Sequence, residues 1–539
     1  MNIRRYGFGA LALVAASTLV LAGCSGSGSS GNGASGSNPA AIISTNGSEP
    51  QNPLIPTNTN ETGGGLILDQ IFAGLVVYDA KGRPQNDGAD SIKSDDSQNY
   101  TIKLKSGQKF TNGEPVTAHS FVDAWNYGAK ASNKQRVSSF FSNIQGYSET
   151  QDSELTGLKV VDDTTFTVAL NAPQSDFPLS LGYSAFYPLP AAAFADMAAF
   201  GQKPIGNGPY KLDGDNAWKH NVEIDLVTNK EYSGPRAPKN GGLKINFYAT
   251  LDAAYSDLLG GNVDVIDKIP DSAFATFKGD LGDRAVNQPA AYVQSFTIPQ
   301  RLAHFSGEEG RLRRRAISLA FDRKEIAKVI FDNTRTPAVD FTSPVIDGWT
   351  DKLSGADVLT YSPDEAKKLW AQADAISPWS GTFTLAYNAD GGHQGWVDAV
   401  TNSIKNTLGI TAQGEPDPTF AQLRTKIVSR SIQTAFRSGW QADYPSLNDF
   451  LRPNYVTGGS SNDGDYSNPE FDSLVAAGLS DTNNTSANQK FQQAQEILLK
   501  DLPVLPLWYQ NVTAGFGTSV ANVEFGWDSV PLFYQITKN

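Results

Sequence analysis

Residues 438–445 read "SGWQADYP" and place one carboxylate, that of Asp443, between the aromatic residues Trp440 and Tyr444. A carboxylate enclosed by rings suits a cation such as an ammonium group, because burying the acid without a counter-charge is costly. The alternative is an ordinary acid on a hydrated surface. The elements that surround this stretch decide between the two.

Other side chains offer little catalytic or metal-binding chemistry. The histidines His119, His220, His304 and His393 stand far apart, and Cys24 is the only cysteine. A zinc site needs such ligands at close spacing, so we expect no metal and no cofactor. No G-x-S-x-G or H-E-x-x-H motif occurs, and we therefore expect a protein that is not an enzyme.

The charge of the chain excludes nucleic acid as a partner. The formal net charge is −13, so no basic surface is expected to release counter-ions from phosphates. The arginine-rich run "RLRRR" at 311–315 is interpreted as the solvated face of a helix. The pair Gly206 and Gly208 in "PIGNGPY" fits neither phosphate-binding fingerprint and is interpreted as a tight turn.

The N-terminus predicts export and lipid attachment. A basic start, a short apolar run and "LAGC" at 21–24 are typical of a secretory signal and resemble a bacterial lipobox. We expect residues 1–23 to be a lipoprotein signal peptide that is cleaved before Cys24. Cys24 would carry the lipid, and residues 24–40, rich in serine and glycine, would form a flexible tether.

Strands and helices alternate along the rest of the chain. Tyr100, Ile102 and Leu104 alternate with polar residues, as do Phe166, Val168 and Leu170, which predicts two half-buried strands. Helical patterns lie between such strands without segregation. This mixture, in a chain long enough for several lobes, predicts an α/β protein of more than one lobe.

The order of several motifs resembles a known family. "FTNGEPVTAHSFVDAWNYG", "PIGNGPYKL", "RRAISLAFDRKEIA", "YSPDEAKKLWAQA", "GWQADYPSLNDFL", "YSNPEFDSLV" and "DLPVLPLWY" follow one another as they do in solute-binding protein family 5 of ABC importers, the oligopeptide- and dipeptide-binding lipoproteins. The resemblance covers nearly all of the chain after about residue 42.

That resemblance implies an α/β, two-lobed periplasmic-binding-protein-like fold of type II, with an extra subdomain inserted in the first lobe. We expect the first lobe at 41–84, 201–289 and 507–539, the inserted subdomain at 85–200, and the second lobe at 290–506. The two lobes would close on a ligand by a hinge motion.

A general peptide receptor must read the backbone and the charged ends, since peptide side chains vary. By resemblance, Gly439, Trp440 and Gln441 form an edge for the peptide backbone, and Asp443 binds its α-ammonium group. Ala73, Gly74 and Leu75 match the segment that meets the ligand from the other lobe. A glycine at the end of a helix is the alternative for Gly74.

The residues for the ligand carboxylate are less defined. Arg437, His393 and Asn388 stand where family members place basic or polar contacts, and a surface or structural role is the alternative for each. An arginine suits a carboxylate best, because its planar fork donates two hydrogen bonds. Trp508 and Tyr509 are further candidates for the cleft, with core packing as the favoured alternative.

These features together predict a lipoprotein that binds short peptides on the outer face of the cytoplasmic membrane of a single-membrane bacterium. It would be a monomer and would deliver its cargo to the transmembrane permease subunits of an ABC importer with cytoplasmic ATPases. Pro445 also occurs in relatives that carry other solutes, so a sugar, a nickel chelate or haem stays open as the ligand. A lipid-anchored hydrolase is the remote alternative.

Overall fold

The computed structural model describes residues 38–539. The predicted signal peptide, Cys24 and most of the predicted tether lie outside the described residues. Of the tether, residues 38–40 are described, and the Asn38 N–H donates to the Lys538 carbonyl at 2.8 Å. The first described residue therefore lies beside the C-terminal strand β20 (Thr537–Lys538).

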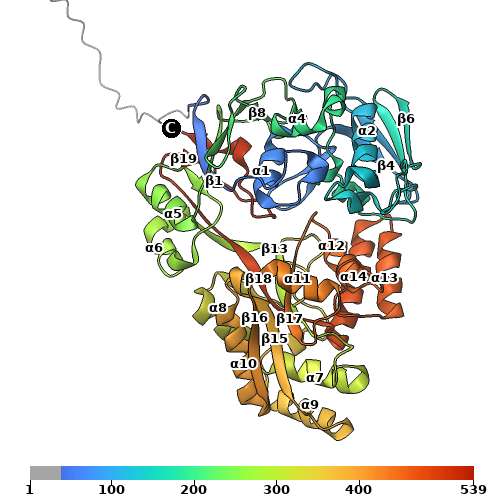
Figure 1. Ribbon diagram of the computed structural model, residues 1–539, viewed down its shortest axis with the longest axis vertical. Coiled ribbons are helices and arrows are strands. Elements are labelled where there is room, and N and C mark those ends of the chain that lie inside the picture. The colour runs from blue at the N-terminus through green and yellow to red at the C-terminus, as the bar shows by residue number, and fades with distance from the viewer. Residues whose placement is uncertain (1–37) are drawn as a thin grey trace, which may run out of the picture. The chain divides into compact units, whose positions relative to one another are not determined.

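Two long antiparallel strands run through the centre of the fold (Figure 1). They are β13 (Ala285–Thr297) and β18 (Val504–Phe516), each of 13 residues. They pair along most of their length, with a shift in register between Pro289 and Val293. Such a bulge bends a strand and increases its local twist. This bulge lies where the buried side chains of β13 change from the hydrophobic core of the first lobe to that of the second lobe.

On one side of this pair stand the strands of the first lobe. In order outward from β18 they are β12 (Val265–Ile266), β1 (Ile42–Gly47), β11 (Gly242–Phe247), β10 (Glu223–Thr228) and β8 (Tyr210–Leu212). On the other side, outward from β13, stand β17 (Ala435–Gln441), β15 (Thr382–Asn388) and β16 (Thr411–Asp417) of the second lobe.

The buried side chains form separate cores on the two sides. In β13, Ala290 belongs to the core of the first lobe, whereas Ala291 and Val293 belong to that of the second. In β18 the change falls between Tyr509 and Val512. These positions lie close to the predicted lobe limits of 289/290 and 506/507, whose role as domain boundaries stays a prediction.

A second sheet lies within the range expected for the inserted subdomain. Its strand order is β4 (Ala89–Lys93), β5 (Asn99–Leu104), β7 (Thr165–Ala169) and β6 (Leu158–Asp162), and helix α2 (Ala118–Ala129) packs beside it. The predicted alternation is confirmed, since Tyr100, Ile102 and Leu104 are buried and their neighbours are exposed. This sheet shares one continuous hydrophobic core with the first lobe.

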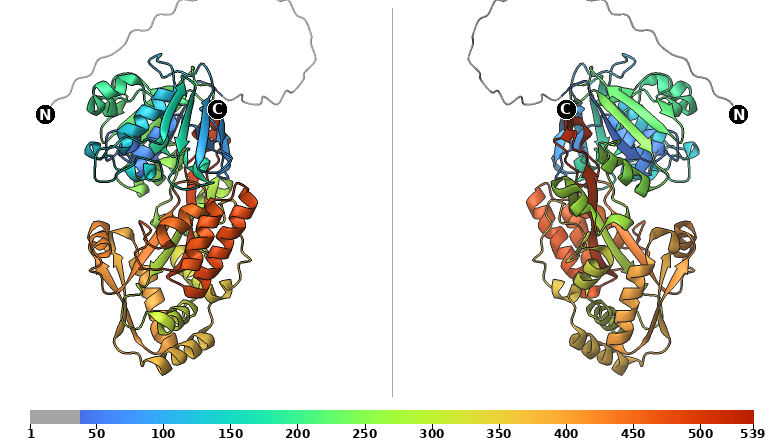
Figure 2. Two further views of the ribbon diagram at one scale, coloured as in Figure 1. Left: turned by 90° about the vertical axis from the view of Figure 1, so that its right-hand side faces the viewer. Right: turned by 90° about the vertical axis from the view of Figure 1, so that its left-hand side faces the viewer.

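Helices cover the strands of the second lobe. Helices α10 (Gln394–Leu408) and α11 (Phe420–Val428) contact β15 and β16, and α7 (Gly307–Leu319) packs against α9 (Pro363–Ile376). Helix α12 (Leu447–Tyr455) follows the "SGWQADYP" stretch directly. Helices α13 (Pro469–Leu479) and α14 (Asn484–Asp501) lie side by side, as Figure 2 shows in red.

The arginine run in α7 is not a solvated face, and that interpretation is wrong. Arg313 is fully buried, pairs with Glu309 at 2.9 Å, and lies 4.5 Å from the ring centre of Trp370. Arg314 is also buried and donates to the Phe305 carbonyl at 2.6 Å. A guanidinium group carries five N–H donors, so it can be buried where carbonyl and carboxylate oxygens surround it.

Within residues 38–539 there is no helix with the length and apolar character needed to cross a membrane.

Candidate ligand-binding site

Strand β17 has one paired edge and one largely open edge. Residues 436–441 pair antiparallel with β13, whereas β15 reaches only Ala435 and Phe436 on the other side. Among the described strands, none pairs with the outer edge of residues 437–441. Free N–H and C=O groups at such an edge can pair with an added extended chain. The predicted docking edge, Gly439 to Gln441, lies in this open part.

Trp440 and Asp443 are held by one buried carboxylate. Asp449, in the first turn of α12, is 4% exposed. Its Oδ2 accepts the Asp443 backbone N–H at 2.9 Å and Trp440 Nε1–H at 3.1 Å. Ser446 caps α12, and its Oγ accepts the Asn448 N–H at 3.1 Å. The motif and the helix after it therefore form one hydrogen-bonded unit.

The carboxyl group of Asp443 is partly buried and has no cationic partner among the described residues. Burial raises the pKa of Asp443 to about 6. Burial first, and the charge of Asp443 second, raise the pKa of Asp449 well above its ordinary value. A bound ammonium group would lower the pKa of Asp443, because an adjacent opposite charge favours the ionised carboxylate.

Tyr183 lies within the range 85–200 predicted for the inserted subdomain. Its hydroxyl group is affected by the charges of Asp443 and Asp449. Burial first and the charge of Asp443 second raise the pKa of the Tyr183 hydroxyl. Asp69 on α1 (Thr62–Ile71) and Asp449 act on Tyr183 in the same direction. Acidic groups from both lobes thus act together on the Tyr183 hydroxyl.

A pocket of about 220 Å³ lies beside Trp440. One wall is the face of β13 and β17 that carries Val293, Ser295, Ser438 and Trp440. Helix α11 and residues 454–466 form the other walls. Ser438 Oγ lies 2.9 Å from both Ser295 Oγ and Thr297 Oγ1, so these hydroxyl groups satisfy one another. The pocket therefore borders residues 436–440 of β17.

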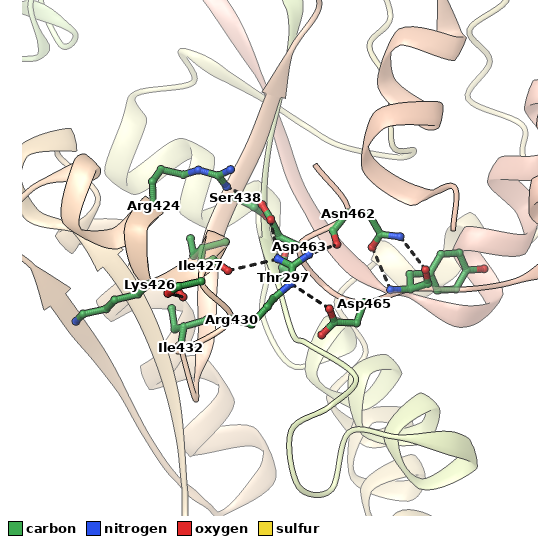
Figure 3. Close-up of polar contacts among 12 residues, drawn as sticks. Thr297, Arg424, Lys426, Ile427, Arg430, Ile432, Ser438, Asn462, Asp463 and Asp465 are labelled. Atoms are coloured by element: carbon green, nitrogen blue, oxygen red, sulfur yellow. Dashed lines mark hydrogen bonds and ion pairs between the residues drawn. The ribbon is translucent and has the colours of Figure 1, made fainter. Parts of the chain in front are cut away.

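A network of ion pairs stands at the pocket, drawn in Figure 3. The Asp463 carboxylate forms ion pairs with Arg424 at 2.6 Å and with Arg430 at 2.9 Å. Arg430 also pairs with Asp465 at 3.3 Å, and Arg301 pairs with the same carboxylate. These ion pairs tie α11 to the loop after α12, and each of the three arginines has a carboxylate partner.

Arg437 differs from those arginines because no carboxylate among residues 38–539 forms an ion pair with it. Its guanidinium group lies over the ring of Phe420, 5.5 Å from the ring centre, and its buried Nε has no hydrogen-bond partner in the described part of the chain. Arg437 lines the pocket together with Trp440. Its predicted role at the ligand carboxylate stays a prediction, and this placement is compatible with it.

Asn388 and His393 lie at the end of β15 and just before α10. Asn388 is buried, and His393 Nδ1 accepts a hydrogen bond from Trp396 Nε1 at 3.1 Å. Because Nδ1 is the acceptor, the proton of a neutral His393 is on Nε2. Neither residue lines the pocket beside Trp440. A contact of either with a ligand carboxylate stays a prediction.

In the first lobe, Ala73, Gly74 and Leu75 are buried and their carbonyl groups are engaged. The Asn207 side chain accepts the Ala73 N–H at 2.9 Å and donates to its carbonyl at 3.0 Å. The Gly74 and Leu75 carbonyls accept the N–H groups of Gly88 and Asp87, respectively. A Cβ on Gly74 would lie 2.8 Å from the Tyr187 ring, which explains the glycine. A role of these residues in ligand binding stays a prediction.

The "PIGNGPY" loop is what positions that segment. A Cβ on Gly206 would lie 1.8 Å from the Ile71 carbonyl oxygen, and the Gly208 N–H donates to the same oxygen at 2.9 Å. Both glycines are therefore needed for close approach of two backbones. Protein backbone occupies the space that a phosphate cradle would need, and the chain bends at Gly208 and Pro209 without a backbone hydrogen bond that closes a turn within residues 204–210.

Trp508 and Tyr509 lie in the core, each 1% exposed. Trp508 packs edge-on against Trp396, with ring centres 5.6 Å apart. The Tyr509 hydroxyl donates to Asp340 Oδ1 at 2.6 Å and accepts the Val339 N–H at 3.0 Å. Core packing, the alternative that the sequence favoured for both, is where the structure places them. A contact with ligand has no support from this placement and stays a prediction.

Pro445 packs between the lobes. A Cβ built on Gly82, in the turn after β2 (Val76–Tyr78), would lie 2.8 Å from Pro445 Cβ, so the turn and the proline are in direct contact. Gly82 has a φ of +73°, which a glycine adopts without strain. Pro445 therefore fills a contact between the motif and the first lobe, and this packing does not depend on the type of ligand.

Asp449 and Asn207 are the residues at this site that reasoning from the sequence missed. The pattern Ser446-x-x-Asp449 predicts the start of a helix, with Asp449 turned to the helix end. The carboxylate instead turns back to Trp440 and Asp443. For Asn207 the signal was the pair of glycines on either side of it, which indicated a close backbone approach but not which backbone.

The two cores, the two long strands that join them, and the open strand edge beside a partly buried acid define a two-lobed solute-binding protein. Solved structures share this fold. A murein tripeptide-binding protein, MppA, in its unliganded open form has a TM-score of 0.79 at 20% identity, covering 92% of this chain and 97% of that one. Haemophilus influenzae OppA in complex with RPPGFSPFR has a TM-score of 0.70 at 22% identity, covering 93% and 100%. The fold is thus the two-lobed α/β fold of periplasmic binding proteins, as predicted.

Sequence comparison identifies the family. The pattern of the bacterial extracellular solute-binding proteins, family 5 (middle region), matches residues 83–462. The chain belongs to this family. It is 27% identical to the periplasmic oligopeptide-binding protein OppA of Salmonella typhimurium over 490 residues, covering 87% of each chain. It is 25% identical to the oligopeptide-binding protein OppA of Bacillus subtilis over 515 residues, covering 92% and 93%. The resemblance inferred from the motifs is confirmed.

Proposed function

We propose that the protein captures short peptides between its two lobes and delivers them to the transmembrane permease of an ABC importer. The observation that carries this proposal is the open edge of β17, which ends at an acid without a cationic partner among the described residues. An extended peptide satisfies both features at once, because its backbone adds to the edge and its ammonium group meets Asp443.

The ammonium contact would be an ion pair with a partly buried acid. An ion pair at 4 Å is worth about 4 kcal/mol before desolvation, at an effective dielectric constant of 20. The bound ammonium group would also favour the ionised form of Asp443. The Trp440 pocket would take one side chain, and Arg437, with Asn388 and His393 as further candidates, would meet the carboxylate end. Ala73, Gly74 and Leu75 would approach from the first lobe.

The names of the relatives support a peptide as ligand. Oligopeptide-binding proteins stand among the similar sequences, and one similar structure is a complex with a nine-residue peptide. A relative named as a probable deoxycholate-binding protein shows that the family name alone does not define the ligand. The edge and the acid favour the peptide, since a neutral solute would leave Asp443 buried without a counter-charge.

The remaining parts of the proposal concern location. We propose that lipid on Cys24 holds the protein at the outer face of the cytoplasmic membrane, and that it works there as a monomer without enzymatic activity. Loaded protein would reach the permease in its closed form, because ligand shifts the equilibrium between open and closed lobes.

Two experiments test the proposal. The first is mass spectrometry of small molecules released by denaturing protein purified from its own host, for which we expect a ladder of short peptides. Sugars, a chelate or haem would overturn the assignment, and turnover of added peptides or cell-wall fragments would overturn a pure binding role. The second is calorimetry with a tripeptide and its N-acetylated form. Wild type should prefer the free amine and Asp443→Asn should not.

A further inference from the structure

We propose that Asp449 is the positioning residue of the site, which fixes the Trp440 ring and the Asp443 carboxylate relative to each other. The inference rests on the proposed function, since it concerns the two residues expected to contact the ligand. Asp449 would not itself touch the peptide. Its part would be to hold the pocket wall and the ammonium anchor in one geometry, so that a ligand meets both together.

The geometry points to this role because two donors converge on one oxygen. The Asp443 N–H and Trp440 Nε1–H both donate to Asp449 Oδ2, at 2.9 and 3.1 Å. One donor belongs to the backbone that carries the anchor, and the other belongs to the ring that lines the pocket. Hydrogen bonds to a buried charged or polar oxygen are stronger and more directional than those at a surface.

Capping of α12 does not explain Asp449. A capping acid would accept N–H groups of its own helix, and in α12 Ser446 Oγ fills that place. Both hydrogen bonds of Asp449 go to residues before the helix. The buried carboxyl group is therefore committed to the motif rather than to the helix end.

The first turn of α12 is itself held by hydrogen bonds to a distant segment. Asp176, on the inserted segment, accepts Ser446 Oγ–H at 2.7 Å and Asn448 Nδ2–H at 3.1 Å through one carboxylate oxygen. Arg452, one turn later, donates to the Asn143 side-chain carbonyl at 3.1 Å. Asp449 is thus presented to the motif by a turn that is hydrogen-bonded to Asp176 and, through Arg452, to Asn143.

The surroundings of the two neighbouring acids, Asp443 and Asp449, contain few positive charges. The groups that face the Asp443–Asp449 pair are the acid Asp176 and the tyrosines Tyr78, Tyr183 and Tyr444, with the charge of Arg452 beyond Tyr444. None of these groups brings a positive charge into contact with Asp443 or Asp449. A ligand ammonium would be the first positive charge in contact with the pair, and it would favour the ionised form of Asp443.

The test compares Asp449→Ala with Asp449→Asn in the full-length protein. The ratio of affinities for a tripeptide and its N-acetylated form is measured by calorimetry, beside the melting temperature. Alanine removes the shared acceptor, so we expect a loss of about 10- to 100-fold in affinity for the free tripeptide and a ratio near one. Asparagine keeps an acceptor oxygen and should stay within about 3-fold at pH 8, with the ratio preserved.

A matched control separates positioning from simple loss of stability. Asp264 is 3% exposed, accepts hydrogen bonds from Ser44 and Ser519, and lies in the first lobe away from α12. Asp264→Ala should lower the melting temperature and leave the affinity ratio unchanged. If Asp449→Ala behaves in the same way, the inference is overturned.

A second measurement holds even if Asp449→Ala does not fold. Asp449→Leu keeps an apolar side chain of similar bulk in the buried position but offers no acceptor for the Asp443 and Trp440 N–H groups, so it should bring the affinity ratio close to one. A folded Asp449→Leu that keeps the wild-type ratio would overturn the inference. If wild type binds neither tripeptide form, the proposed function fails and the inference fails with it. If wild type discriminates and both variants match it, only the inference fails.

Discussion

The side-chain amide of Asn207 bonds to both backbone polar atoms of Ala73, which lies 134 residues earlier in the chain. An amide side chain here makes the two bonds that a neighbouring strand would make. The Ala73 segment is therefore fixed from behind before any ligand arrives. The loop that carries Asn207 reaches it only because Gly206 and Gly208 have no side chains.

Replacing Asn207 by Ala should destabilise the protein. The buried N–H and C=O of Ala73 would both lose their partner, which costs roughly 2–4 kcal/mol of unfolding free energy. Urea unfolding measures this change. Asn171→Ala is the control, because Asn171 is exposed, and its change should stay within about 0.5 kcal/mol. Equal effects of the two substitutions would contradict the role assigned to Asn207.

Two glycine substitutions should show whether Gly206 is needed because its backbone lies against that of Ile71 or only because glycine is flexible. Gly206→Ala forces a Cβ to within 1.8 Å of the Ile71 carbonyl oxygen, and backbone on both sides leaves no room to yield. We expect misfolding or a large loss of melting temperature. Gly65→Ala, in α1, meets nothing within 4 Å and should stabilise the helix by about 1 kcal/mol. A tolerated Gly206→Ala would show that the loop does not press on Ile71.

Asp443→Asn should stabilise the unliganded protein above about pH 6. The folded-state pKa of Asp443 is raised to about 6 by burial, so its proton is bound more tightly in the folded state. Stability is then highest below the ordinary pKa of an aspartate and falls as pH rises through about 6. Asparagine cannot ionise and avoids that loss. Thermal melts at pH 4 and pH 8 should show a gain for the variant only at pH 8.

Asp264→Asn provides a control of opposite sign. Burial acts to raise the pKa of Asp264, but hydrogen bonds from Lys538, Ser44 and Ser519 hold it below its ordinary value. Its stabilising contribution is present above the ordinary pKa of an aspartate and is lost as pH falls. Asp264→Asn should therefore be less stable than wild type at pH 8. A gain for both variants would refute the assigned pKa directions.

Arg313→Ala should be among the most destabilising changes in the second lobe. It leaves the partners Glu309 and Asp374 without their buried cation and removes the guanidinium group that lies over Trp370 and Trp379. Breaking a buried pair in this way costs about 3–5 kcal/mol. Arg311→Ala, which removes a more exposed pair with Glu308, should cost less than about 1 kcal/mol. Urea unfolding of both variants decides whether burial makes the difference.

Cys24→Ser should release the protein from the membrane. Serine offers no thiol for lipid attachment, so the predicted anchor is lost while the folded body is unchanged. Fractionation of host cells, with immunoblotting of membrane and medium, should show the variant in the medium. Retention of Cys24→Ser in the membrane fraction would exclude lipid on Cys24 as the anchor.

Local patterns in the sequence predicted local structure well. The alternation of Tyr100, Ile102 and Leu104 is reproduced in their burial, because side chains in a strand point alternately to opposite faces. The burial of the arginines of α7 was not predicted, because their partners come from distant segments, such as Asp374 and the Asp501 carbonyl.

The sequence alone determined the family and the α/β class and singled out the "SGWQADYP" stretch as a candidate site, because these depend on residue type and order. Only the tertiary structure decided that β17 has an open edge there and that Asp443 has no cationic partner among the described residues. It also decided that Asp449 turns toward Trp440 and Asp443. Burial and hydrogen-bond partners follow from packing between segments far apart in the chain, which spacing along the sequence does not encode.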